Sequence, residues 1–168
     1  MQISVIGSNE SAGKEALKTA EELGKEIARA GAVLVCGGKL GVMEAACRGA
    51  KLEGGTTVGI LPNSIEEANE FLDIKIPTGI GYARNTIVAN SGDAVIAVCG
   101  SIGTLIEILY SCIFGKKVIL LKGTKGTADN FDKIMEIPEI KEKIEKCGAE
   151  VLEAETPKEA VEIALRSI

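Results

Sequence analysis

Short apolar runs alternate with helical patterns of apolar positions along the whole chain. The apolar runs predict strands at residues 3–7, 32–36, 56–62, 71–79, 93–99, 117–123 and 149–154. The helical patterns predict helices at residues 14–31, 42–54, 81–92, 104–115, 129–147 and from Thr156 or Pro157 onward. Such alternation is typical of a parallel sheet with helices on both faces. We therefore predict one α/β domain over residues 1–168, a Rossmann-like three-layer sandwich with a mostly parallel sheet of about seven strands.

The composition limits the chemistry that this domain can perform. Histidine is absent, which removes the commonest general base, the commonest metal ligand and every Ser-His or Cys-His nucleophile pair. Any reaction must use carboxylates, Lys, Arg or backbone dipoles. The five cysteines are an odd number and show no C-x-x-C spacing, so we expect reduced thiols, no metal site and a cytoplasmic protein.

Charge and hydropathy indicate a small-molecule partner. The net charge is −5, with three Phe, two Tyr and no Trp, whereas a nucleic-acid surface needs a basic stripe and stacking platforms. No apolar run reaches the length of about 18 residues that suggests a membrane span, and no basic leader precedes the first strand. We expect neither nucleic-acid binding, nor secretion, nor insertion into a membrane.

Two glycine-rich turns share one pattern. Both VCGGKLGVMEAAC (35–47) and VCGSIGTLIEILY (98–110) run from strand through cysteine and glycines into a helix, and each has a glutamate eight residues after its cysteine, Glu44 and Glu107. Glycines allow close approach to a ligand, and the amides of a helix N-terminus suit an anionic phosphate. Parallel strands would bring both turns to one crevice. The predicted ligand-binding residues are Gly37, Gly38, Gly41, Glu44, Gly100, Ser101, Gly103 and Thr104.

Each of these features also has a plain structural explanation. Glycine turns join strands to helices, and a carboxylate in a first helical turn is favoured by the helix dipole alone. Arg84 in GYARN (81–85) offers bidentate geometry toward a phosphate, yet a simple salt bridge would explain it equally well. Lys14 either helps bind a phosphate or is solvated, and the role of Lys39 stays open.

Three segments together resemble the LOG-like superfamily, whose members often carry a lysine-decarboxylase label. They are GGKLGVMEAACRGA (37–50), YARN (82–85) and CGSIGTLIEI (99–108), and the resemblance covers most of the chain. Known branches include cytokinin-activating phosphoribohydrolases and molybdenum cofactor carrier proteins. Cys99 and Ser101 depart from the P-G-G-x-G-T-x-x-E motif of the hydrolases, and the M-E-A-A and A-R-N pieces look closer to the carrier branch.

The resemblance implies two readings of the same site. In a carrier the turns would hold a bound nucleotide or molybdopterin-type ligand, with no resident cofactor required. In a phosphoribohydrolase Gly100, Gly103 and Thr104 would hold a 5′-phosphate, while Glu107, kept ionised by the helix N-terminus, and Arg84 would be catalytic beside the ribose.

The resemblance also bears on assembly and on the lysine-decarboxylase label. It implies a homodimer or homotetramer, and the apolar helix end LYSCIFG (109–115) would lie either in an interface or in the core. A lysine decarboxylase is not expected, because no histidine is present to stack on pyridoxal phosphate and no lysine stands in a recognisable cofactor context.

Overall fold

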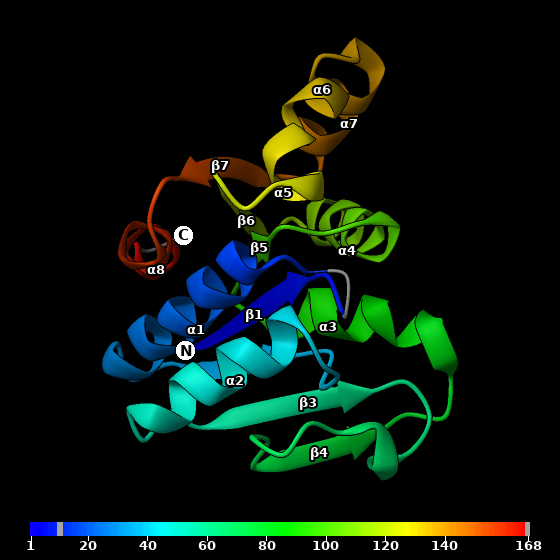
Figure 1. Ribbon diagram of the computed structural model, residues 1–168. Coiled ribbons are helices and arrows are strands. Elements are labelled where there is room, and N and C mark those ends of the chain that lie inside the picture. Colours follow the sequence, from blue (N-terminus) through cyan, green and yellow to red (C-terminus); the bar gives the residue numbers. More distant parts are fainter. Residues whose placement is uncertain (10–11, 167–168) are drawn as a thin grey trace.

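The computed structural model describes residues 1–9 and 12–166, and it shows one sheet of seven parallel strands between helices (Figure 1). The strands are β1 (Gln2–Gly7), β2 (Val33–Cys36), β3 (Thr57–Leu61), β4 (Ile74–Pro77), β5 (Ala94–Val98), β6 (Lys117–Leu121) and β7 (Glu150–Ala154). The helices are α1 (Lys14–Arg29), α2 (Val42–Leu52), α3 (Asn85–Ser91), α4 (Ile102–Ile113), α5 (Gly126–Asn130), α6 (Asp132–Met135), α7 (Pro138–Lys146) and α8 (Pro157–Leu165), with 3-10 helices η1 (Ile65–Glu67) and η2 (Gly81–Arg84). The predicted Rossmann-like fold is confirmed.

The strand order creates a crevice in the middle of the sheet. The order is β4-β3-β2-β1-β5-β6-β7, so the chain builds one half outward from β1 and then returns to build the other half from β5. β1 and β5 are parallel neighbours, with Gly7 beside Val98 at their carboxyl ends. In open α/β sheets ligands bind outside the carboxyl ends of the strands at such a switch point.

Two hydrophobic cores lie on opposite faces of the sheet. On one face Leu23 of α1, Ala46 of α2 and Ala160 of α8 are fully buried against the strands. On the other face Val88 of α3 and Ile108 of α4 are buried, together with residues of α5 and α7. The central strands β5 and β6 are therefore covered on both sides, which explains why they are continuous apolar runs in the sequence.

Some predicted boundaries change. The expected strand 71–79 contracts to β4, an exposed edge strand. The expected helix 129–147 is replaced by α5, α6 and α7, and Pro138 occupies the start of α7, where a proline is tolerated although it cannot continue a preceding helix. Thr156 caps α8 as predicted, because its side-chain oxygen accepts the N–H of Glu159 at 3.2 Å. Among the described residues, no helix has both the length and the apolar character needed to cross a membrane.

Helices α1 and α2 pack so closely that two glycines are required where they cross. A Cβ at Gly24 would lie 1.9 Å from the carbonyl oxygen of Ala46, and a Cβ at Gly49 would lie 1.9 Å from that of Glu21. Backbone atoms cannot move away as a flexible side chain can. The small side chains of both helices thus set the separation between α1 and α2 on this face of the sheet.

We expect Gly24→Ala to lower the free energy of unfolding by about 1–3 kcal/mol, as overpacking does, although alanine is the better helix former. Gly13→Ala is the control, because an added Cβ there meets no atom of the described residues within 4 Å; it should change stability by less than about 1 kcal/mol. Urea unfolding followed by circular dichroism measures both. Equal stability of the two variants would contradict the close crossing.

Candidate functional site

A cavity of about 440 Å³ lies at the carboxyl ends of β1 and β5. Four segments line it: the end of β1 with the loop after it, the turn between β2 and α2 with the start of α2, η2 with the start of α3, and the first two turns of α4. The lining residues are Gly7, Ser8, Asn9, Lys39, Met43, Tyr82, Arg84, Asn85, Ser101, Ile102, Gly103, Thr104, Ile106 and Glu107. The position at the switch point and the volume both suit a small ligand.

Arg84 is buried in the wall of this cavity, with only 7% of its surface exposed. Its Nη1 donates to Asn85 Oδ1 at 2.7 Å and to Glu107 Oε1 at 3.4 Å. Its Nη2 donates to the carbonyl oxygen of Gly37 at 3.0 Å. Its Nε is buried and has no hydrogen-bond partner among the residues that the structure describes. Because buried donors are normally paired, this N–H is available to an acceptor that does not belong to the described residues.

Glu107 faces Arg84 from α4 and is 6% exposed. Burial raises the pKa of its carboxyl to about 7, although the positive charge of Arg84 acts in the opposite direction. The expectation that the helix N-terminus keeps Glu107 ionised is wrong. Helix α4 begins at Ile102, two residues earlier than predicted, which puts Glu107 in the second turn, where the helix dipole has little effect. Both protonation states of Glu107 are therefore populated near neutral pH.

The second glycine turn is held in shape from the side of α5. Cys99 and Gly100 both adopt positive φ, 58° and 111°. The N–H of Thr127 donates to the carbonyl oxygen of Gly100 at 3.0 Å, and the N–H of Ala128 donates to that of Cys99 at 2.9 Å. These bonds turn the carbonyl groups toward α5. The chain then enters α4 at Ser101, beside the cavity.

Three of the residues predicted to bind an anion lie at the start of α4. Ser101, Gly103 and Thr104 line the cavity, whereas Gly100 shapes the turn and borders a neighbouring apolar cavity of about 510 Å³. The first N–H groups of any helix have no acceptor within it, so those of α4 are open to a ligand. That these residues hold a phosphate stays a prediction.

The glycines of the first turn support the site without lining the cavity, whereas Lys39 of the same turn does line it. A Cβ at Gly37 would lie 2.5 Å from Arg84 Nη2, so the glycine makes room for the guanidinium group. A Cβ at Gly41 would lie 2.2 Å from the carbonyl oxygen of Asn9. Gly38, at φ 73°, keeps the turn tight. The two turns thus meet through Arg84, and the predicted ligand contacts of Gly37, Gly38 and Gly41 have no counterpart in the cavity lining.

Glu44 and Lys14 lie elsewhere. Glu44 is in the first turn of α2, as expected, but it borders a separate cavity of about 280 Å³ together with Arg48. Lys14 borders a depression on α1 that includes Lys18. The two glutamates that match in the sequence are therefore not partners in one site, and only Glu107 faces the cavity.

Two asparagines that sequence reasoning did not single out take part in the site. Asn69 is buried, and its Nδ2 donates to the carbonyl oxygens of Gly38 at 3.1 Å and Lys39 at 3.0 Å. Asn9 lines the cavity, and its Oδ1 is buried without a hydrogen-bond partner among the described residues. Neither lies in a recognisable motif, and Asn69 acts on residues 30 and 31 positions away, so no local pattern could have revealed them.

Comparison with a family model decides the relationship of this chain. The model described as the SLOG cluster4 family matches residues 1–161. The chain belongs to the SLOG cluster4 family. The predicted resemblance to the LOG-like superfamily is thereby confirmed.

Known structures and sequences of relatives extend this assignment. The molybdenum cofactor binding protein from the phototrophic bacterium Rippkaea orientalis is 37% identical with a TM-score of 0.83, over 96% of this chain and 93% of that chain. The molybdenum cofactor carrier protein from Chlamydomonas reinhardtii is 35% identical with a TM-score of 0.80, over 99% of both chains. A cytokinin riboside 5′-monophosphate phosphoribohydrolase from Mycobacterium tuberculosis is 37% identical over 56% of this chain and 52% of its own length.

In this SLOG protein the buried Glu107 should make stability depend on pH. Between a pKa near 4.5 in the unfolded chain and about 7 in the folded protein, only the folded state holds the proton. Wild-type protein should therefore lose stability relative to Glu107→Gln as pH rises through this window, by up to about 3 kcal/mol. Urea unfolding of both proteins at several pH values between 4.5 and 8 measures the difference. A difference that does not change with pH would contradict the raised pKa.

Proposed function

We propose that this SLOG protein binds a phosphorylated, nucleotide-like ligand in the switch-point cavity and serves as a carrier for a molybdopterin-type cofactor. The observation that carries the proposal is the buried guanidinium of Arg84, whose Nε has no partner among the described residues, in a cavity bordered by the start of α4. The cofactor is cargo in this proposal, and no resident cofactor is needed. Likeness over nearly the whole chain to two molybdenum cofactor proteins supports the carrier role.

The cavity offers complementary groups for each part of such a ligand. The phosphate would lie against the open N–H groups at the start of α4 and accept from Arg84 Nε, because charge-assisted bonds and helix N-termini both favour phosphate oxygens. The buried Oδ1 of Asn9 would accept a hydrogen bond from a hydroxyl or amine of the ligand. Met43 and Ile106 provide apolar wall for a flat heterocycle.

In a carrier, Glu107 would bind the ligand by hydrogen bonds and would not take part in a reaction. A pterin or purine ring presents both donors and acceptors along its edges. With a pKa of about 7, the carboxyl of Glu107 can accept a hydrogen bond when ionised or donate one when protonated. The same buried group therefore suits recognition of a heterocycle.

Phosphoribohydrolase activity is the second candidate, and the Arg84–Glu107 pair favours it specifically. Water would cleave the N-glycosidic bond of a nucleoside 5′-monophosphate, giving the free base and ribose 5-phosphate. Ionised Glu107 would stabilise the oxocarbenium-like transition state, or protonated Glu107 would give its proton to the departing base. Arg84, 3.4 Å from that carboxyl, would hold the phosphate or keep Glu107 oriented.

The binding proposal predicts a loss of affinity in Arg84→Lys. Calorimetry with nucleoside monophosphates and a phosphorylated pterin should show binding by wild-type protein, with the parent nucleosides binding more weakly. The lysine keeps the charge but loses the Nε donor and the bidentate fork, so affinity should fall roughly 10-fold or more, equivalent to about 1.4 kcal/mol. Arg48→Lys, on α2 outside the cavity, is the matched control and should bind as wild type does.

The same samples separate the two candidate functions. Release of ribose 5-phosphate that disappears in Glu107→Gln would show hydrolysis and would replace the carrier reading. Binding of the phosphorylated pterin without release from any nucleotide would support the carrier. Failure of wild-type protein to bind any phosphorylated ligand would contradict the proposal as a whole.

We also propose that the protein is a cytoplasmic homodimer or homotetramer. The segment 109–115, which the sequence assigned either to the core or to an interface, is buried in part and exposed in part. Ser111 and Cys112 are buried, while Ile113 and Phe114 are 59% and 40% exposed. The exposed apolar side chains on and beside α3 and α4 are Tyr82, Ile87, Ile102, Ile106, Ile113 and Phe114. A cluster of exposed apolar side chains of this size is typical of a surface that binds another protein surface.

We expect Ile113→Glu to shift the protein from a dimer or tetramer to a smaller species, because it puts a charge into the proposed interface. Light scattering coupled to size exclusion measures the mass. Ile137→Glu is the control, since Ile137 is similarly exposed but lies between α6 and α7. A monomeric wild-type protein, or an unchanged mass in Ile113→Glu, would contradict the assignment of this face.

A further inference from the structure

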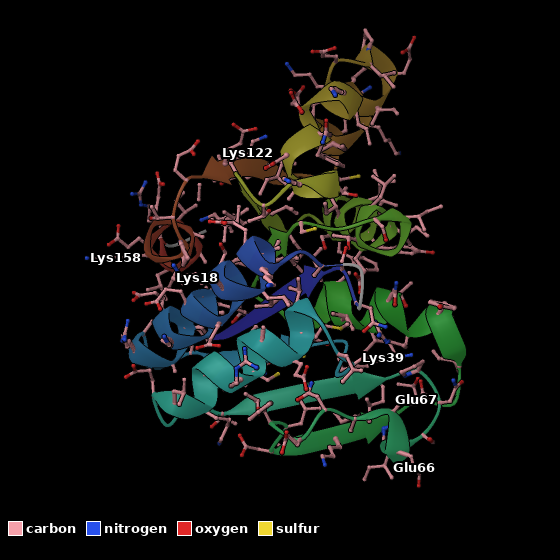
Figure 2. The ribbon with its side chains drawn as sticks, in the orientation of Figure 1. Lys18, Lys39, Glu66, Glu67, Lys122 and Lys158 are labelled. Atoms are coloured by element: carbon pink, nitrogen blue, oxygen red, sulfur yellow. The ribbon has the colours of Figure 1, made fainter. Side chains whose placement is uncertain are left out.

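Lys39 reaches the cavity from the first glycine turn and is paired with a carboxylate of a different loop. Its ammonium lies 3.2 Å from Glu67 Oε2, at the end of η1. Figure 2 shows both residues beyond the carboxyl end of β3, on the side of the molecule where the chain passes from β3 to β4. Together with Arg84, Lys39 supplies the positive charge of the cavity lining.

The backbone and the side chain of Lys39 are held in different ways. Buried Asn69 holds the backbone of this turn. Its Nδ2 donates to the carbonyl oxygen of Lys39, and its backbone N–H donates to the carbonyl oxygen of Gly38 at 2.9 Å. The side chain, by contrast, is tied through an ion pair whose members are 34% and 26% exposed. The backbone is therefore fixed, while the ammonium can change its partner at little cost.

Glu67 keeps other partners if Lys39 leaves. Its carboxylate accepts the N–H of Ser64 at 3.4 Å in the capping box of η1. Hydrogen bonds from Asn63 and then from Lys39 hold the pKa of Glu67 below its usual value, and the bond from Asn63 contributes more. Departure of Lys39 would thus leave a satisfied, ionised carboxylate.

Arg84 cannot leave its present partners for a ligand as Lys39 can. Its guanidinium is already bonded to Gly37, Asn85 and Glu107, and its Nε has no partner among the described residues. A phosphate dianion carries two negative charges, more than the single positive charge of Arg84 balances. Within the described lining of the cavity, Lys39 is the remaining cation.

We propose that Lys39 is a ligand-binding residue that pairs with Glu67 in the free protein. When a ligand binds, the ammonium of Lys39 leaves Glu67 and pairs with the anionic group of the ligand. The inference rests on the proposed function, since it requires an anion in the cavity. It makes Glu67 a competitor of the ligand: the carboxylate lowers affinity in the free protein by occupying the ammonium. Binding then breaks the ion pair between Lys39 and Glu67 that joins the first glycine turn to η1, while Asn69 still holds the backbone of the turn.

The alternative, a salt bridge that only supports the loop, predicts a different pattern. If the pair is purely structural, removing either member has the same effect on binding, because either change breaks the same contact. If Lys39 exchanges partners, the two changes have opposite effects. Removing Lys39 removes a ligand contact, whereas removing the charge of Glu67 frees Lys39 for the ligand.

The test measures the affinity for inorganic phosphate, and for nucleoside monophosphates in parallel, by calorimetry at low and constant ionic strength. We expect Lys39→Met to weaken phosphate binding at least several-fold and Lys39→Arg to retain most of it. Glu67→Gln should strengthen binding several-fold. Lys122→Met is the matched control, because Lys122 also pairs with a carboxylate, that of Glu153 at 3.0 Å, but lies far from Lys39 (Figure 2). It should leave affinity unchanged, and thermal unfolding checks that every variant is folded.

The outcomes are distinct from those that test the proposed function. Opposite shifts in Lys39→Met and Glu67→Gln with inorganic phosphate support the exchange, even if no nucleotide or pterin phosphate binds and the proposed function fails. Shifts in the same direction, no effect of Lys39→Met, or no binding of phosphate by wild-type protein overturn the exchange. Tight binding of a phosphorylated pterin with unchanged affinity in Lys39→Met would overturn it while the proposed function stands.

Discussion

The burial of Arg84 against Glu107 is the constraint on which the candidate site depends. A guanidinium can be removed from water only if its donors are bonded and its charge is opposed. The structure meets these demands in part, with the carbonyl oxygen of Gly37, the side chain of Asn85 and the carboxyl of Glu107, and leaves Nε without a partner among the described residues. The absence of a side chain at Gly37 is part of the same arrangement, because any Cβ would collide with the guanidinium.

The parallel sheet is what allows these groups to meet. Gly37 follows β2, Arg84 precedes α3 and Glu107 belongs to α4, so they come from segments well separated in the chain. Their common location follows from the strand order, which brings the carboxyl ends of β2, β1 and β5 side by side. The open N–H groups of α4 reach the same place for the same reason. The two functions proposed for this cavity would use the same framework and would differ in whether Glu107 reacts.

The positive charges of the cavity lining are both already opposed by carboxylates. Arg84 is paired with Glu107 inside the wall, and Lys39 is paired with Glu67 at the rim. Such internal pairing lowers the cost of keeping cations near an apolar cavity before a ligand arrives. It also means that an anion must replace or supplement an existing partner, which favours ligands with concentrated negative charge, such as phosphate, over weakly charged ones.

The sequence by itself determined the fold class and the segments of the site. Alternation of apolar runs with helical patterns specifies strands and helices locally, and the glycine turns and YARN mark the segments that surround the cavity. Only the tertiary structure decided that Glu44 lies outside the cavity, that Lys39 and Asn9 belong to it, and that the carboxyl of Glu107 has a pKa of about 7. The physical reason is that burial and long-range contact set these properties: the desolvation of a carboxyl depends on what the whole fold packs around it, which no short stretch of residues encodes.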